Sequence, residues 1–375
     1  RTSDSSHLWS QTYERPMTDV FKVQDEIAAA VVEQLKIKLL GAAPRAKTTD
    51  PRAYALFLQA REMHRQYNSS AFEQSIDLYR QVLAIDPTYA AAWVGLAAVY
   101  SDQVDIYLIP ADEGSRLARE AAQRALALDP RHAPAHARLG WIATYYDRDL
   151  AEGTRQIEHA LALEPANPDI LAIAAGHARR LGRLDQAIVI GEYLTVRDPL
   201  NLQGRYELAT AHYYAGRLDE AIAIYRDDLR LFPDGIGEHE MIGEALLKKG
   251  DAKGALAEIE QEPDEGIRLV GLAMAYHALG RQAESEAALG SLIKKYEKTM
   301  AWSIALVFAF RDDADRAFEW LGKAAKLRDP TVGSTAAYPL LSNLHSDARW
   351  LPFLRKHGMA PEQLAAIKFD VKLPN

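Results

Sequence analysis

The chain has 375 residues, and its 44 basic and 52 acidic residues give a formal net charge of −8 at pH 7. Surfaces that bind nucleic acid normally carry a basic surplus, so we expect no nucleic acid to bind this chain. Hydrophobic residues make up 48 % of the sequence, which is typical of a globular protein and excludes an intrinsically disordered one. Because cysteine is absent, disulfides, thiolate metal sites and cysteine nucleophiles are excluded.

The N-terminal residues are polar and then amphipathic. RTSDSSHLWS has no initiator methionine and no signal-peptide pattern, so we expect a piece of a longer chain. Residues 17–40 have helical periodicity with Thr18 or Asp19 as the N-cap, which predicts an N-terminal arm and capping helix over residues 1–48. The apolar runs are far shorter than the roughly 20 residues of a membrane span, so no membrane insertion is expected.

Five prolines at near-regular intervals organise the middle of the chain. Each ends an amphipathic segment such as LALDP or LRLFP, and each follows a small residue twelve positions earlier. The intervals are 43, 35, 34 and 34 residues, between Pro87, Pro130, Pro165, Pro199 and Pro233. A repeat of about 34 residues holds two short helices and their turns, so the sequence predicts stacked helix pairs.

A second motif, of the type Gly-Arg-Leu-Asp, recurs between the paired helices. Its glycines are Gly182, Gly216, Gly250 and Gly280. Glycine adopts the left-handed conformation of a helix C-cap without steric cost, so we expect these four residues to be C-caps.

The spacing of large, small, aromatic and proline positions resembles the tetratricopeptide repeat (TPR). The best unit, residues 202–233, matches the pattern at Leu208, Ala209, Gly216, Ala221, Tyr225 and Pro233. The resemblance implies an all-α TPR solenoid, a right-handed superhelix of about eight antiparallel helix pairs, over residues 49–330. A C-terminal capping helix and tail are then expected over residues 331–375.

The two flanks carry a second resemblance. Residues 6–35 and 316–359 are similar to the segments that precede and end TPR arrays in bacterial signalling proteins of two kinds, adenylate cyclase-like and winged-helix transcriptional regulator-like. Neither a cyclase nor a winged-helix domain is found in this sequence, so neither activity is carried over. The resemblance implies a soluble sensor or effector arm, and it leaves the cytoplasmic and the periplasmic side of such a protein open.

Catalytic motifs were sought and not found. The sequence contains no GxxxxGK[ST], no GxSxG, no HExxH and no GxGxxG after a strand. We therefore expect no enzymatic activity, no cofactor and no metal site.

The resemblance also points to candidate binding residues. In TPR proteins the first helix of each pair lines the concave face, and positions five, nine and twelve of a unit form one stripe. The candidates on this stripe are Trp141, Arg179, Tyr206, Thr210, Tyr213, Glu240 and Glu244. Aromatic and arginine side chains often anchor interfaces, so we expect a protein or peptide ligand in the concave groove.

Three alternatives stay open at this point. Trp141 and Tyr213 could fill space between neighbouring helices instead of contacting a ligand. The chain could be an oligomerisation scaffold with an empty groove. It could also be a sensor whose aromatic groove stacks on a small molecule or an oligosaccharide.

The C-terminal tail changes period. Apolar residues alternate with charged ones from Ile367 to Leu373, which predicts a strand with one covered face. The strand could pair with the N-terminal LWSQTY, within one chain or across a homodimer. Alternatively, the tail could lie extended on the solenoid.

Overall fold

The computed structural model describes residues 50–374, and its regular elements in this range are all helical. Eight antiparallel pairs follow one another. They are α2 (Pro51–Arg65) with α3 (Ser69–Ile85), α4 (Ala90–Asp105) with α5 (Ala111–Leu128), α6 (Ala133–Ile142) with α7 (Leu150–Leu163), α8 (Pro168–Arg180) with α9 (Leu184–Arg197), α10 (Leu202–Tyr214) with α11 (Leu218–Leu231), α12 (Glu238–Lys248) with α13 (Ala252–Ile259), α14 (Glu265–Ala278) with α15 (Gln282–Tyr296), and α16 (Ala301–Phe310) with α17 (Ala314–Lys326). The expected solenoid of about eight pairs is confirmed.

Short elements complete the described part of the chain. A π-helix, η2 (Ala143–Asp147), extends α6. Two 3₁₀ segments, η3 (Pro330–Ala337) and η4 (Pro339–Ser346), follow the last pair and lead to α18 (Trp350–Lys356) and α19 (Pro361–Ala366). The expected N-terminal capping helix and the LWSQTY arm lie outside the described residues.

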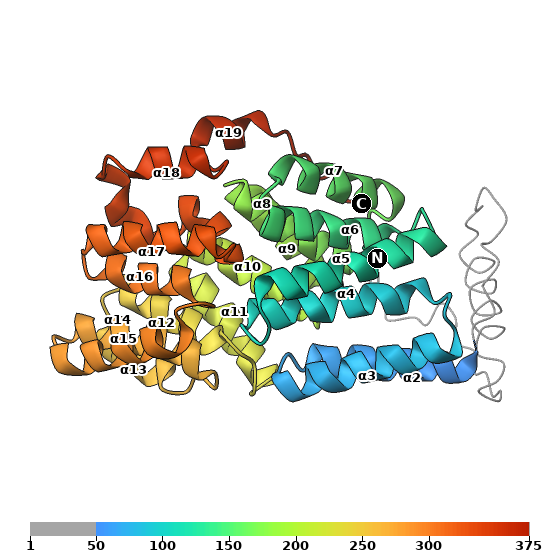
Figure 1. Ribbon diagram of the computed structural model, residues 1–375, viewed down its shortest axis with the longest axis horizontal. Helices are drawn as coiled ribbons and strands as arrows, with labels where there is room; N and C mark the ends of the chain where they lie inside the picture. The colour runs from blue at the N-terminus through green and yellow to red at the C-terminus, as the bar shows by residue number, and fades with distance from the viewer. Residues whose placement is uncertain (1–49, 375) are drawn as a thin grey trace, which may run out of the picture.

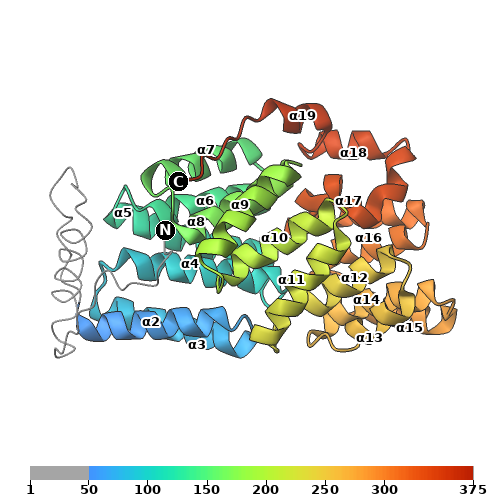
Figure 2. The ribbon, with the colours of Figure 1, turned by 180° about the vertical axis from the view of Figure 1, so that it is seen from behind.

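The superhelix turns back on itself, so that its late elements meet its early ones. In Figures 1 and 2, α18 and α19 run from α17 back towards α7. Arg148, just after η2, donates a hydrogen bond to the carbonyl oxygen of Ala325 in α17 at 3.3 Å. Arg180 of α8 donates to the carbonyl oxygen of Pro330 at 3.1 Å. These contacts bring the two halves of the solenoid together around its interior.

Each of the eight turns inside a pair contains one residue with a left-handed backbone. Four are the expected glycines, Gly182, Gly216, Gly250 and Gly280, with φ between +70° and +80°. The other four are Tyr67, Tyr107, Arg148 and Asp312. The same backbone turn thus recurs in every pair, although half of the sequences lack its glycine.

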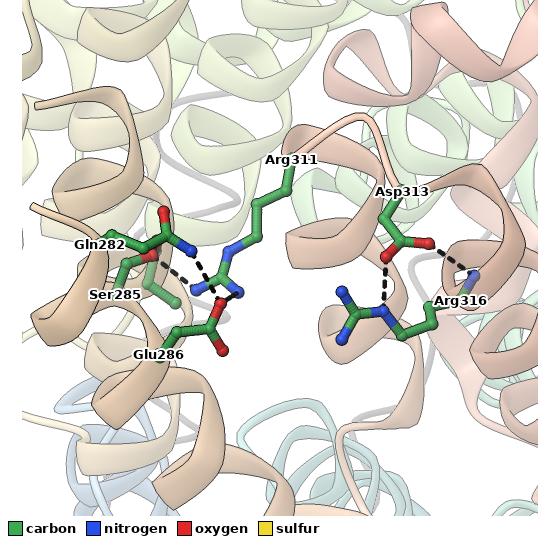
Figure 3. Close-up of polar contacts among 7 residues, drawn as sticks. Gln282, Ser285, Glu286, Arg311, Asp313 and Arg316 are labelled. Atoms are coloured by element: carbon green, nitrogen blue, oxygen red, sulfur yellow. Dashed lines mark hydrogen bonds and ion pairs between the residues drawn. The ribbon is translucent and has the colours of Figure 1, made fainter. Parts of the chain in front are cut away.

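The last of these turns shows how side chains hold neighbouring helices together (Figure 3). Arg311, which follows α16, donates to Glu286 Oε1 at 3.0 Å and to Ser285 Oγ at 2.5 Å, and so ties α16 to α15. Asp313 is the N-cap of α17, since its Oδ1 accepts from the backbone N–H of Arg316 at 3.0 Å. This turn therefore has both an inter-pair contact and a helix cap.

The C-terminal tail lies extended on the solenoid, which is the alternative arrangement that the sequence left open, and it forms no strand in the described residues, so the prediction of a paired strand is wrong. Its alternation is nevertheless real, because Phe369 is buried while Lys368 and Asp370 are exposed. The guanidinium of Arg183 donates to two tail carbonyl oxygens, and Phe369 lies edge-on to His177 with ring centroids 4.9 Å apart. The tail is thus held by side chains of α8, of the turn after it and of α9, where a strand would have needed a sheet edge.

Replacing glycine by alanine should have opposite effects on stability at a turn and inside a helix. Gly216 has φ +76°, whereas Gly290 lies inside α15, and a methyl group at either position would meet no atom within 4 Å. Gly216→Ala should lower the free energy of unfolding by about 1 kcal/mol through left-handed strain. Gly290→Ala should raise it by about 0.5–1 kcal/mol through helix propensity. Urea denaturation measures both, and a Gly216→Ala variant as stable as the parent would contradict the assigned turn.

The docked tail predicts a change in proteolysis. Phe369→Ala removes the buried ring, so the tail should leave the solenoid more often and trypsin should cleave after Lys368 and Lys372 several-fold faster. Asp370→Ala, at a neighbouring exposed position, serves as the control. Mass spectrometry of timed digests follows both, and equal cleavage rates in the parent and the Phe369→Ala variant would show that the ring does not hold the tail.

Candidate functional site

The interior of the superhelix contains a cavity of about 660 Å³. Its helical wall comes from the first helices of all eight pairs, from η2 and from η3, and the second helices contribute Tyr79 alone among the described residues. This is the arrangement expected for a TPR concave face. A cavity of this volume falls within the range of ligand-binding sites, so it is the candidate functional site.

Most of the sequence-predicted binding residues line this cavity. They are Trp141, Arg179, Tyr206, Thr210 and Glu240. Tyr213 and Glu244 are fully buried behind the lining, where the Tyr213 hydroxyl donates to Glu244 Oε2 at 2.8 Å. The structure thus brings five of the seven side chains to one surface and places two in the supporting layer.

One of the predicted residues, Arg179, is held in a buried ion pair. Its Nε and Nη2 atoms donate to Glu207 Oε2 at 3.0 and 2.9 Å. Gly176, one turn before Arg179, leaves the room for this carboxylate, because a Cβ atom there would stand 2.7 Å from Glu207 Oε1. Since both charges are satisfied, Arg179 stiffens the wall and offers a ligand little unpaired charge.

Two tyrosines in the lining were missed by the sequence reasoning. Tyr67 and Tyr107 occupy left-handed positions in the turns after α2 and α4, where other pairs have glycine. The Tyr107 hydroxyl lies 3.5 Å from Ser303 Oγ of α16, across the cavity wall. A bulky left-handed residue is strained, and such strain is common at binding sites. The missing turn glycine was the available signal.

The lining also contains two buried arginines that the concave stripe did not include, Arg138 of α6 and Arg180 of α8. Both interrupt apolar helix sequences, HARLGWI and AAGHARRL, and this was the sequence signal for them. Glu238 and Glu240 of α12 also line the cavity, but burial raises the pKa of both, to about 8 for Glu238, so their neutral forms are favoured at neutral pH.

The structure of residues 50–374 was also searched for a membrane-spanning helix and for a metal site. No helix there is both long and apolar enough to cross a bilayer. In the same residues, no group of three or more His, Asp or Glu side chains is arranged to hold a metal ion.

Two neighbouring carboxyl groups lie at the cavity wall, Glu240 in the lining and Glu244 behind it. Burial and the neighbouring Glu244 carboxylate raise the pKa of Glu240 well above its usual range. Burial also raises the pKa of Glu244, but less, because its Oε2 accepts hydrogen bonds from Tyr213 and Tyr338, each at 2.8 Å, that stabilise its charged form. At neutral pH the pair therefore keeps one proton, on Glu240.

This proton predicts a pH-dependent stability. The unfolded chain releases it near pH 4.5 but the folded chain retains it, so the free energy of unfolding falls as pH rises, by up to about 1.4 kcal/mol per pH unit. Glu240→Gln removes this titration and should make the decline between pH 6.5 and 8.5 shallower, while Glu238 and Glu262, whose pKa values burial raises to about 8 and about 7, still contribute to it. The window avoids His177, whose pKa is lowered to about 3 by burial. Glu220→Gln on the exposed face of α11 is the control, and parallel profiles of parent and Glu240→Gln would refute the shared proton.

Parts of the chain are similar to parts of known proteins, although no family model matches the chain. The putative adenylate cyclase 3 of Rhizobium meliloti is 33 % identical over 97 residues, which cover 25 % of this chain and 16 % of the cyclase. The transcriptional regulator HilA of Salmonella typhimurium is 25 % identical over 176 residues, which cover 47 % of this chain and 31 % of the regulator. The chain thus spans less than a third of either relative.

Among solved structures, the APC/C hetero-tetramer Cut9–Hcn1 contains a chain that superposes with a TM-score of 0.54 at 15 % sequence identity. The match covers 89 % of this chain and 59 % of that one. A likeness at this identity concerns the fold alone, and it agrees with the eight helix pairs and their recurrent turns. The described part of the chain is a TPR solenoid.

Proposed function

We propose that this chain is the protein-interaction arm of a bacterial signalling or regulatory protein and that it binds a segment of a partner protein in the interior cavity. The observation that carries the proposal is the cavity wall, to which every inner helix contributes. A surface built from eight successive repeats favours an extended ligand, because such a ligand can contact several repeats at once.

The size and chemistry of the cavity favour a peptide segment over a folded domain. About 660 Å³ holds a few residues of a chain, and a whole domain is far too large for it. Tyr206 offers a partly exposed aromatic ring, and Glu240 lies one inner helix further on. Aromatic side chains supply much of the affinity of protein interfaces at low conformational cost.

The relatives support the signalling context. The similarity to an adenylate cyclase and to a transcriptional regulator is what an arm of a multidomain regulatory protein would show. The chain covers only 16 % and 31 % of these proteins, so their activities are not assigned to it. An arm of this kind would couple the capture of a partner to a domain elsewhere in the protein.

A random peptide library displayed on phage tests the proposal. Selection against the chain should enrich a consensus sequence, and the synthetic peptide should bind with a Kd that fluorescence anisotropy can measure. Tyr206→Ala should weaken this binding by tenfold or more, because loss of an anchoring ring costs roughly 2 kcal/mol. Trp141→Ala should act in the same direction, and circular dichroism verifies that helix content is retained.

The matched control is Tyr193→Ala, since Tyr193 lies on the outer helix α9 and takes no part in the cavity wall. It should leave the affinity for the selected peptide unchanged. Failure to enrich any consensus, or equal affinities of the parent and the Tyr206→Ala variant, would exclude peptide capture in the cavity.

A further inference from the structure

Two arginines in the cavity wall have hydrogen-bonding capacity that nothing in the described chain uses. Arg138 is 7 % exposed and Arg180 is 8 % exposed. The Nε and Nη1 atoms of Arg138 and the Nε atom of Arg180 are buried without a hydrogen-bond partner among residues 50–374. A guanidinium stays charged at all physiological pH values, so it cannot avoid the cost of burial by losing its proton. An anionic partner is the remaining way to offset that cost.

The carboxylates around these arginines are engaged elsewhere. Glu207 is paired with Arg179, and Asp102 Oδ2 lies 2.6 Å from His64 Nε2. Asp105 is the acid that both Arg138 and Arg180 influence electrostatically, yet no ion pair within 4.0 Å joins it to either one. Burial also raises the pKa of Asp105 well above its usual range, which favours its neutral form. The positive charge of Arg138 therefore has no counter-ion in the described part of the chain.

Two stacked aromatic rings orient the arginines. Trp141 and Tyr145 stack with centroids 4.6 Å apart and planes 16° from parallel. The Arg180 guanidinium lies 3.8 Å from the Tyr145 ring centroid, and that of Arg138 lies 5.5 Å from the Trp141 centroid. Cation–π contacts of this kind fix the plane of a guanidinium but leave its N–H edge available for an acceptor. All four side chains line the cavity.

We propose that this end of the cavity binds a small organic anion through a carboxylate or phosphate group held by Arg138, with Arg180 adding positive charge to the same wall. The Nε atom of Arg138 has no partner, and together with Nη2 it forms the side-on edge of the guanidinium, whose two parallel N–H donors can bind two oxygens of one carboxylate or phosphate. Trp141 and Tyr145 give the carbon skeleton of the ligand an apolar surface, and the cavity has room for a metabolite-sized molecule. The proposal is independent of the partner segment, because it needs neither Tyr206 nor Glu240.

Thermal unfolding at constant ionic strength tests this binding. The probes are inorganic phosphate, succinate and citrate, each at 10 mM, and neutral succinamide is the control ligand. A bound anion stabilises the folded chain in proportion to ln(1 + [L]/Kd), so at least one anion should raise the Tm by several degrees, and succinamide should not. A response to phosphate alone identifies a phosphate ligand, and a response to succinate or citrate identifies a carboxylate ligand. If chloride at equal ionic strength produces the same shift as the oxyanions, or if no probe shifts the Tm, the proposal is wrong.

Variants assign the effect to the arginines. Arg138→Gln should weaken the binding of the active anion by tenfold or more, while the Tm without ligand stays equal or rises, because an unpaired charge has been removed. Arg155→Gln on α7 removes an exposed arginine that pairs with Glu152, and it should leave the anion effect intact. Retention of the anion-induced shift in Arg138→Gln would overturn the proposal.

A second variant keeps the test decisive if Arg138→Gln folds poorly. Because burial favours the neutral form of Asp105, Asp105→Asn should leave both the Tm without ligand and the anion-induced shift unchanged in the full chain. If Asp105 were instead the charged counter-ion of the arginines, Asp105→Asn would lower the Tm without ligand. That result would place the pairing inside the protein and refute the ligand.

Discussion

The structure depends on how closely the two helices of each pair approach one another. Small residues face the partner helix along the stack, and Gly140 of α6 is an example, because a Cβ atom there would stand 2.7 Å from Ile157 Cγ1 of α7. The same applies to Gly243, whose Cβ atom would collide with Ile259 of α13. Close approach keeps each repeat thin, and thin repeats let the superhelix complete a turn within eight pairs. The contact between Arg148 and α17 follows from this geometry.

A solenoid wound this tightly encloses polar groups that a more open one would leave in water. The interior wall therefore contains charges that must be paired, and the chain pairs them in different ways. Arg179 and Glu207 neutralise each other, and Glu240 keeps its proton beside the charged Glu244. Arg138 is not paired with a carboxylate, and a guanidinium cannot lose its charge by giving up a proton. A buried guanidinium without a counter-ion, in the same wall as the paired Arg179 and Glu207, is the feature that points to a ligand.

The architecture could be predicted from the sequence because each repeat contains its own local signals and the same signals recur along the chain. The proline intervals and the glycines, such as Gly216 with its left-handed backbone, fix the length and the turn of each unit without knowledge of the rest. The C-terminal tail shows what local sequence patterns cannot predict. Its alternation predicted a covered face correctly, but the partner was the surface of α8 and α9 and not a strand, and no local pattern says which distant surface will be available.

The candidate site was predictable in part for the same reason. Helical spacing placed Trp141 and Tyr206 on the inner face, and both line the cavity. It also assigned Tyr213 and Glu244 to that face, although they lie behind the lining, because Tyr338, far away in the sequence, packs against both of them. Burial also separates Glu244 from the cavity by placing the hydroxyls of Tyr213 and Tyr338 against it.

The left-handed tyrosines connect the repeat to the cavity. At Tyr67 and Tyr107 the turn keeps its backbone but gives up the glycine that would adopt it without strain. A bulky residue in this conformation costs on the order of 1 kcal/mol or more, and the four pairs that have glycine in this turn show that the fold does not require it. Both rings line the interior cavity, in the first two pairs of the array. The two tyrosines thus lower the stability of their turns but add aromatic surface to the cavity. Such a loss of stability is expected where a cavity wall has evolved to bind a ligand.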